Sequence, residues 1–389
     1  MSFPRILSGL LMALMVGSLT PVAAQTGPVS VTLSEPDATY DEPFSALSGL
    51  RELSDGTVLV GDRIDQFIQH INLANGTAKA VSKQGAGPGE YDTPMGLYAL
   101  PNDSTLVFDM GNNRFLVITP EGRPGDTFMP TLETGGGPGA RFLSPPQGVD
   151  AAGGIYFAGR PMRMGPSGMP ESIDSAAIIR YDRASRTVDT LGLAKAPAMN
   201  IQASGDQNRR ELRIRPAPMP TQDDWGVTDD GRVGIARIGG RKVEWLSRDG
   251  RRTPGPAFAY QPIKVSKADY RAWQERMGSS MGREVTNGRS RLVRIPPPEI
   301  DESEWPEYKP PFPAGAVQVA PDGELWLLRS RPGDDPTPVY DVFDGAGKLI
   351  RHVMLPEDTR LVGFGRDSVY LVRIDDDDLQ WLERYRRPQ

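Results

Sequence analysis

Short apolar runs alternate with turns that contain Gly, Asn, Asp or Pro along most of the chain. One clear unit begins at Met95, where the runs 95–100, 105–109, 114–118 and 126–129 are separated by such turns. Runs of 4–8 residues that are rich in β-branched and aromatic side chains and bounded by turn residues are typical of β-strands. The same order of runs recurs, and its copies begin near residues 47, 95, 147, 225, 316 and 361.

Repeated four-stranded units predict a six-bladed β-propeller, an all-β fold in which small sheets are arranged radially around a channel. The sixth copy holds only three runs, whereas the strand-like run 29–33 (VSVTL) belongs to no copy. We therefore predict that this N-terminal run supplies the fourth strand of the sixth blade. Such a pairing closes the ring and covers two open strand edges.

The first 24 residues predict a secretory signal peptide. Arg5 precedes an uncharged run over 6–19, and the small residues Val22, Ala23 and Ala24 resemble a cleavage site. The run is shorter than the roughly 20 residues that a membrane-spanning helix needs. We expect residues 25–389 to form one propeller domain without a membrane span, in a protein that is periplasmic or secreted.

Composition narrows the chemistry. The chain has no Cys and two His, His70 and His352, which excludes disulfides, Cys-ligated metals and three-histidine metal sites. Both His fall in runs that we assign to outer strands, so we expect structural roles for them. The net charge of -6 argues against a nucleic-acid partner.

Two connections between copies are near duplicates, 85–94 (GAGPGEYDTP) and 136–145 (GGPGARFLSP), and the first leads into 108–118 (FDMGNNRFLVI). Over the first three copies these segments resemble the Gly-x-Gly-x-Gly-x-Phe…Pro…Asp-x-Gly-Asn-x-Arg pattern of NHL-type propellers. In particular, they resemble the exported six-bladed propellers of bacteria. We expect Asp109 and Asn112 to bind loop amides and Arg114 to reach a carboxylate on a neighbouring strand. The resemblance implies a fold, which is a poor guide to function.

Long insertions gather on one side of the predicted disc. The turns between strands one and two and between strands three and four lie on one face, which we term the turn face. The other connections lie on the opposite face, termed the loop face. The insertions 159–174, 195–221 and 261–312 all belong to the loop face, and loops of such length are commonly functional. We predict a binding face there, over the central channel.

The insertions are more basic than the rest of the chain, with a net charge of +2 over 205–215 and +4 over 267–294. A helix is predicted from a capping-box start at Ser266 and Asp269 up to Gly278, either packed on the disc or lying as a lid across the channel mouth. Basic and aromatic residues suit a small anionic ligand, unless the arginines pair with local acids. The candidate ligand-binding residues are Arg160, Arg163, Arg209, Arg210, Arg213, Tyr270 and Trp273.

Our leading interpretation is a monomeric, non-catalytic module that binds a small anionic ligand or a protein partner on the loop face. The alternative is a calcium-dependent lactonase-, esterase- or lyase-like enzyme, because several enzymes of this fold hold a metal in the channel. A structural role in a cell-envelope assembly is a third interpretation. No catalytic residue, metal ligand or cofactor is assigned, and Ca²⁺ is the ion that the alternative would need. The acidic run Asp375–Asp378 is either a solvated turn or a Ca²⁺ ligand set.

Overall fold

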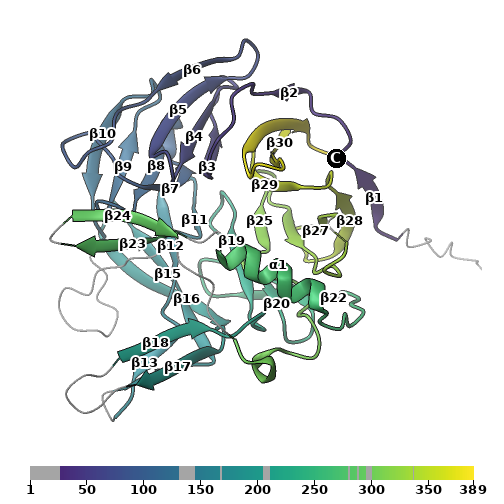
Figure 1. Ribbon diagram of the computed structural model, residues 1–389. Helices are drawn as coiled ribbons and strands as arrows, with labels where there is room; N and C mark the ends of the chain where they lie inside the picture. Colours follow the sequence, from purple (N-terminus) through teal and green to yellow (C-terminus); the bar gives the residue numbers. More distant parts are fainter. Residues whose placement is uncertain are drawn as a thin grey trace, which may run out of the picture.

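The computed structural model describes residues 27–130, 145–166, 169–204, 211–278, 281–286, 289–294, 300–335 and 337–389. Six sheets surround a central channel, and each contains four strands whose neighbours are antiparallel (Figure 1). The predicted all-β six-bladed propeller is therefore confirmed. The first strand of every blade begins within two residues of its predicted position.

In each blade the strands run in order from the channel to the rim. Blade 1 consists of β3 (Leu47–Glu52), β4 (Val58–Asp62), β5 (Phe67–Asn72) and β6 (Thr77–Ala80), and blade 2 of β7 (Pro94–Ala99), β8 (Thr105–Asp109), β9 (Arg114–Ile118) and β10 (Pro124–Phe128). Blade 3 consists of β11 (Gly148–Val149), β12 (Gly154–Ala158), β15 (Ser175–Asp182) and β16 (Thr187–Lys195), and blade 4 of β19 (Asp224–Val227), β20 (Val233–Arg237), β21 (Lys242–Leu246) and β22 (Arg252–Ala257). Blade 5 contains β25 (Val317–Val319), β26 (Leu325–Leu328), β27 (Val339–Phe343) and β28 (Leu349–Met354), and blade 6 contains β29 (Thr359–Phe364), β30 (Ser368–Ile374) and β31 (Gln380–Arg386).

The N-terminal segment closes the ring, but with a different strand from the one predicted. β2 (Ala38–Thr39) pairs antiparallel with β31 and completes blade 6. The predicted closing strand, β1 (Val29–Thr32), instead pairs in parallel with β28 and adds a fifth strand to blade 5. The prediction was wrong because β2 contains only two residues and so has no strand periodicity, whereas β1 is the more obvious apolar run.

The hydrophobic core lies between neighbouring blades. One cluster joins blades 6 and 1, and it includes Val58 and Ile71 together with Tyr370 and Leu382. Its member Tyr40 follows β2, so the closing segment contributes apolar burial as well as strand pairing. Similar clusters join blade 2 to blade 3 and blade 4 to blade 5.

Glycines let the innermost strands approach one another. Five inner strands have Gly directly before an apolar residue, at Gly49, Gly96, Gly148, Gly226 and Gly363. A Cβ atom added to Gly226 would lie 2.8 Å from Val319 of the next blade, and one on Gly148 would lie 2.9 Å from Val227. On Gly49 it would lie 2.7 Å from the backbone nitrogen of Leu97. Gly49, Gly148 and Gly226 therefore leave space for the inner strand of the following blade.

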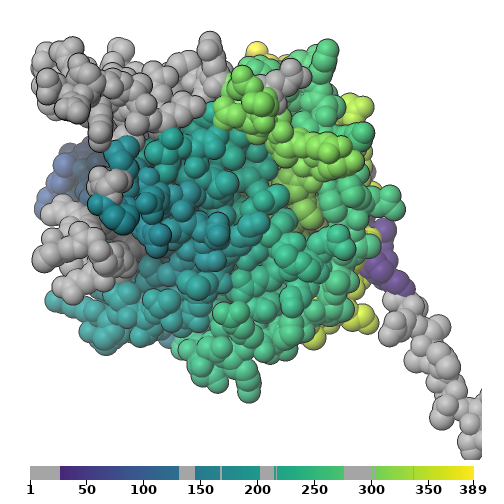
Figure 2. Space-filling view, turned by 90° about the horizontal axis from the view of Figure 1, so that it is seen from below, coloured from purple at the N-terminus to yellow at the C-terminus, as the bar shows by residue number. Residues whose placement is uncertain are grey.

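The long insertions carry structure of their own on the loop face. They form the hairpins β13 (Met162–Met164)–β14 (Pro170–Ser172), β17 (Met199–Ser204)–β18 (Glu211–Pro216) and β23 (Met281–Thr286)–β24 (Arg289–Arg294), the helix α1 (Lys267–Gly278) and the 3₁₀ turn η2 (Glu302–Glu304). The predicted helix is confirmed, whereas the hairpins were not foreseen. Figure 2 views the rim of the disc, and brighter green chain from the connection between blades 4 and 5 lies along its upper side. None of the helices in the described part of the chain is both long and apolar enough to cross a membrane.

Candidate functional site

The Asp-Gly-Asn-Arg motif of blade 2 has a structural role. Asp109 is fully buried at the end of β8, and its Oδ1 accepts hydrogen bonds from the amides of Asp92 (3.0 Å) and Thr93 (3.3 Å). Its Oδ2 accepts hydrogen bonds from Asn112 Nδ2 (2.7 Å) and Arg114 Nε (3.3 Å). The expectations for Asp109 and Arg114 are confirmed, whereas the Asn112 side chain donates to the Gly85 carbonyl (2.9 Å) and to Asp109 and binds no amide that the structure shows. Since its polar groups bind within the blade connection, the motif indicates no ligand.

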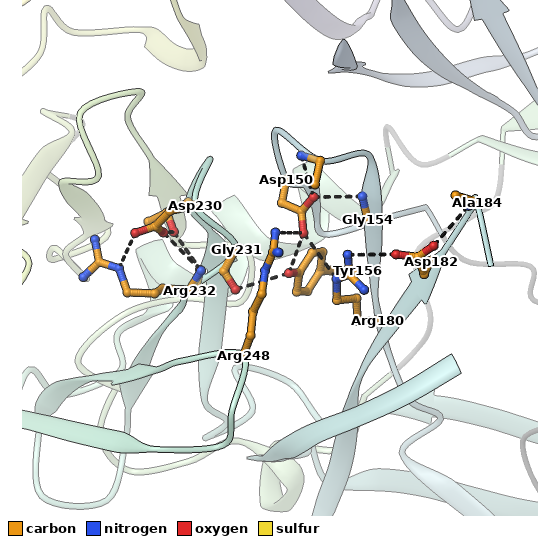
Figure 3. Close-up of polar contacts among 12 residues, drawn as sticks. Asp150, Gly154, Tyr156, Arg180, Asp182, Ala184, Asp230, Gly231, Arg232 and Arg248 are labelled. Atoms are coloured by element: carbon orange, nitrogen blue, oxygen red, sulfur yellow. Dashed lines mark hydrogen bonds and ion pairs between the residues drawn. The ribbon is translucent and has the colours of Figure 1, made fainter. Parts of the chain in front are cut away.

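A polar network on the turn face joins blades 3 and 4 (Figure 3). Asp150 is fully buried, and its Oδ1 accepts hydrogen bonds from the amides of Ala152 (3.0 Å) and Gly154 (2.8 Å). Its Oδ2 accepts hydrogen bonds from the Tyr156 hydroxyl (2.9 Å), Arg180 Nε (3.3 Å) and Arg248 Nη2 (2.7 Å), the last of which comes from blade 4. Burial, reinforced by the charge of Asp150, raises the pKa of Tyr156 to about 12. This network stabilises the contact between the two blades.

The described part of the chain does not bring the five predicted arginines together in one site. Arg160 and Arg163 are exposed on the blade 3 insertion, where Arg163 Nε lies 3.3 Å from Glu171 Oε2 on the facing strand β14. Arg209 and Arg210 lie outside the described residues. The backbone of Arg213 lies in β18, and its side chain is not among the parts that the structure describes.

α1 is anchored at its N-terminus by the predicted capping box. The Ser266 hydroxyl accepts a hydrogen bond from the Asp269 amide (3.3 Å), and Asp269 Oδ2 accepts one from the Ser266 amide (2.9 Å). The buried Asp269 carboxylate also pairs with Lys309 Nζ, which donates a second hydrogen bond to the Arg331 carbonyl (2.6 Å). Burial acts to raise the pKa of Asp269, but the hydrogen bonds from Lys309 and Ser266 outweigh it and lower the pKa. These contacts hold the helix against the loops of blade 5.

Tyr270 and Trp273, both predicted site residues, pack on one side of α1 against Trp305. Their ring centroids lie 5.1 Å and 5.5 Å from that of Trp305, both in edge-to-face geometry. Trp305 directly follows η2, where Glu304 Oε2 binds Arg215 Nη2 of β18 at 2.6 Å. The insertions before blades 4 and 5 therefore form one connected assembly. Sequence reasoning missed Trp305, because a single Trp between prolines and acidic residues has no periodicity.

A pocket of about 890 Å³ lies beside this aromatic cluster, between α1 and the segment 300–307. It is lined by Lys264, Val265, Ser266, Lys267, Tyr270, Arg271, Ile300, Trp305, Pro306 and Glu307. The cations Lys264, Lys267 and Arg271 are exposed, and none forms an ion pair within the part of the chain that the structure describes. The one acid, Glu307, accepts a hydrogen bond from Tyr308. The pocket therefore combines aromatic rings with an excess of unpaired positive charge.

A calcium-dependent enzyme would need a set of metal ligands. Among the described residues, no three His, Asp or Glu side chains converge as metal ligands would. His70 lies in β5 and binds the Thr57 hydroxyl at 2.6 Å, and His352 lies in β28 and binds Asp341 at 2.7 Å. Asp375 accepts hydrogen bonds from the amides of Asp377 and Leu379, so it caps its own turn.

Comparison with known proteins gives only distant structural likenesses. No protein-family model matches the chain, and no curated protein matches it significantly. Among solved structures, it is similar to a member of the DUF4221 family from Bacteroides vulgatus (10% identity, covering 91% of this chain and 94% of that one, TM-score 0.44). It is also similar to a gluconolactonase from Xanthomonas campestris (13% identity, covering 92% of this chain and 98% of that one, TM-score 0.44). A third similar structure is a Bacteroides fragilis protein whose name marks it as a candidate for export (10% identity, covering 93% of this chain and 99% of that one, TM-score 0.45). At these identities and TM-scores the likeness assigns no ligand or activity.

Proposed function

We propose that this chain is an exported six-bladed propeller that binds a small carboxylate-bearing ligand in the pocket between α1 and residues 300–307. One observation carries the proposal, the juxtaposition of Lys264, Lys267 and Arg271 with the rings of Tyr270 and Trp305 around a single hollow. Export rests on the signal-peptide pattern of residues 1–24.

The chemistry of the lining favours an acidic sugar among small anions. Aromatic rings bind the apolar face of a sugar ring, while Lys and Arg supply donors and charge for a carboxylate. Small-molecule pockets usually enclose about 300–1,000 Å³, a range that includes this one. The cations carry no partner in the described part of the chain, so a carboxylate would not need to break an existing ion pair.

The rigid anchoring of α1 supports a preformed site. Asp269 is tied to Ser266 and Lys309, and Tyr270 and Trp273 of the same helix pack against Trp305. A pocket wall that is ordered before binding reduces the entropy lost when a ligand is bound.

Isothermal titration calorimetry with digalacturonate tests the proposal directly, and its methyl ester is the matched uncharged probe. We expect digalacturonate to bind, and the ester to bind about tenfold more weakly or worse, because it lacks the charges that meet Lys267 and Arg271. Affinity should also fall as salt is raised, since these side chains are exposed to solvent.

The double variant Lys267→Ala/Arg271→Ala should remove the preference for the acid over the ester. Its matched control is Lys79→Ala/Arg251→Ala, which deletes one Lys and one Arg that are exposed on other blades. If the acid and the ester bind equally well to the unmodified protein, or if the control lowers affinity as much as the pocket variant does, the proposed site is wrong.

A further inference from the structure

A second cavity lies in the channel itself, on the opposite side from α1. It has a volume of about 570 Å³ and is formed by the last residues of the inner strands and the turns that follow them. Its wall includes an apolar ring with one residue from each blade, namely Leu50, Leu97, Val149, Val227, Val319 and Phe364. Because the turns on this face are short, no long insertion among the described residues covers its mouth.

Most charged groups at the mouth of this cavity are occupied by contacts between blades. Arg51 of blade 1 pairs with Asp103 of blade 2 at 2.7 Å and also binds the Thr105 hydroxyl at 2.6 Å. Glu52 accepts hydrogen bonds from the Tyr370 hydroxyl (2.6 Å) and from the Arg366 amide (3.0 Å). These groups stabilise the ring and are not free for a ligand.

Two opposite charges at the same mouth have no partner among the residues that the structure describes. The Asp229 carboxylate of blade 4 and the Arg366 guanidinium of blade 6 both line the cavity, and neither side chain forms a hydrogen bond or ion pair with the described residues. They lie on either side of blade 5, whose Gln318 also lines the cavity.

The surroundings of both charges favour a bound counter-charge. Burial, with added repulsion from Asp230 and Asp150, raises the pKa of Asp229, so a nearby cation would stabilise its ionised form. The backbone of Arg366 is held at its amide by Glu52 and at its carbonyl by Arg387 Nη2 (3.1 Å). Its side chain therefore starts from a fixed position at the rim.

We propose that the turn-face end of the channel binds a zwitterionic ligand of the short-peptide class, with its ammonium group at Asp229 and its carboxylate at Arg366. The apolar ring below would receive the side chains of the ligand. This site lies on the other face of the disc from the acidic-sugar pocket and does not depend on it.

Trialanine is the probe, and its N-acetylated and C-amidated forms each lack one of the two charges. By calorimetry on the full mature chain, we expect trialanine to bind and each blocked form to bind about tenfold more weakly. Asp229→Asn should abolish the discrimination against the acetylated form, and Arg366→Gln should abolish the discrimination against the amide. Each variant should leave the other discrimination in place, which a general loss of structure would not do.

The matched controls are Asp126→Asn and Arg251→Gln, both at exposed positions that do not line the cavity. They should keep both discriminations. Equal binding of all three peptides would overturn the proposal, and so would the absence of trialanine binding tighter than about 1 mM.

Discussion

Replacing Gly49 with Ala tests whether the inner strands depend on glycine for their close approach. The added methyl carbon would lie 2.7 Å from the backbone nitrogen of Leu97 and 2.9 Å from the Cα of Gly96. Both neighbours are backbone atoms of the next inner strand, so no side-chain rotation can relieve the clash. The strands of blades 1 and 2 would have to move apart at the channel.

The expected cost follows from two opposing terms. Overpacking of this kind destabilises by about 1–3 kcal/mol, whereas Gly→Ala substitution stabilises by about 0.4–1 kcal/mol through the unfolded state. We therefore expect a net loss of about 1–2 kcal/mol in the free energy of unfolding. Gly226→Ala should cost less, since its closest neighbours are atoms of the Val319 and Val317 side chains.

Urea unfolding, followed by tryptophan fluorescence, measures the effect. The matched control is Gly239→Ala, because an added Cβ there meets no atom within 4 Å and its φ is not positive. The control should be as stable as the unmodified protein or slightly more so. If Gly49→Ala and Gly239→Ala unfold within about 0.5 kcal/mol of each other, inner-strand glycines are not required by packing and the reasoning fails.

Three further predictions concern the titration of Asp224, the buried Asp150–Arg180 pair and the closure of the ring by β2. Burial, together with repulsion from Asp223, raises the pKa of Asp224 to about 6, so its stabilising contribution is complete below pH 3.8 and is lost as pH rises through 6. Relative to Asp224→Asn, the unmodified protein should lose about 2 kcal/mol of unfolding free energy between pH 4 and 7, and parallel pH profiles would contradict this. Asp150→Ala leaves the buried Arg180 without its main partner and should cost about 3–5 kcal/mol in urea unfolding, against a negligible change for Asp126→Ala. A chain that begins at residue 35 lacks β1 and should still unfold in one cooperative transition. A chain that begins at residue 43 also loses β2 and Tyr40, and its free energy of unfolding should be lower by at least about 2 kcal/mol. Equal stability of the two chains would show that β2 does not close the ring.

The sequence predicted the blades well because each blade has local signals. Turn glycines such as Gly56, Gly122 and Gly250 have positive φ, as tight turns between strands require. Apolar runs between such turns can form strands wherever the turns hold them in register. The first strands of all six blades could therefore be located to within two residues.

Elements that depend on distant partners could not be predicted in this way. β2 is a strand only because β31, more than 300 residues later, offers it an edge. The strands β13 and β14 contain only three residues each, too few for a periodic signal, whereas β17 (MNIQAS) and β18 (ELRIRP) do alternate between apolar and polar residues and could have been predicted. Trp305 becomes part of a site only where α1 folds back over it, and the channel cavity is assembled from the ends of six separate strands.

The distribution of paired charges distinguishes the surfaces that hold the blades together from the two hollows proposed as binding sites. On the turn face, arginines pair across blade boundaries, as in Arg51–Asp103, Arg248–Asp150 and Arg387–Asp322. Such pairs are already satisfied by the fold, and a ligand could use them only by breaking them. A charge that the described fold leaves unpaired at a cavity can instead bind a ligand without that loss. By this criterion the unpaired charges at the loop-face pocket are all cations and lie beside aromatic rings. The unpaired charges at the channel mouth are one of each sign. The two hollows should therefore select chemically different ligands.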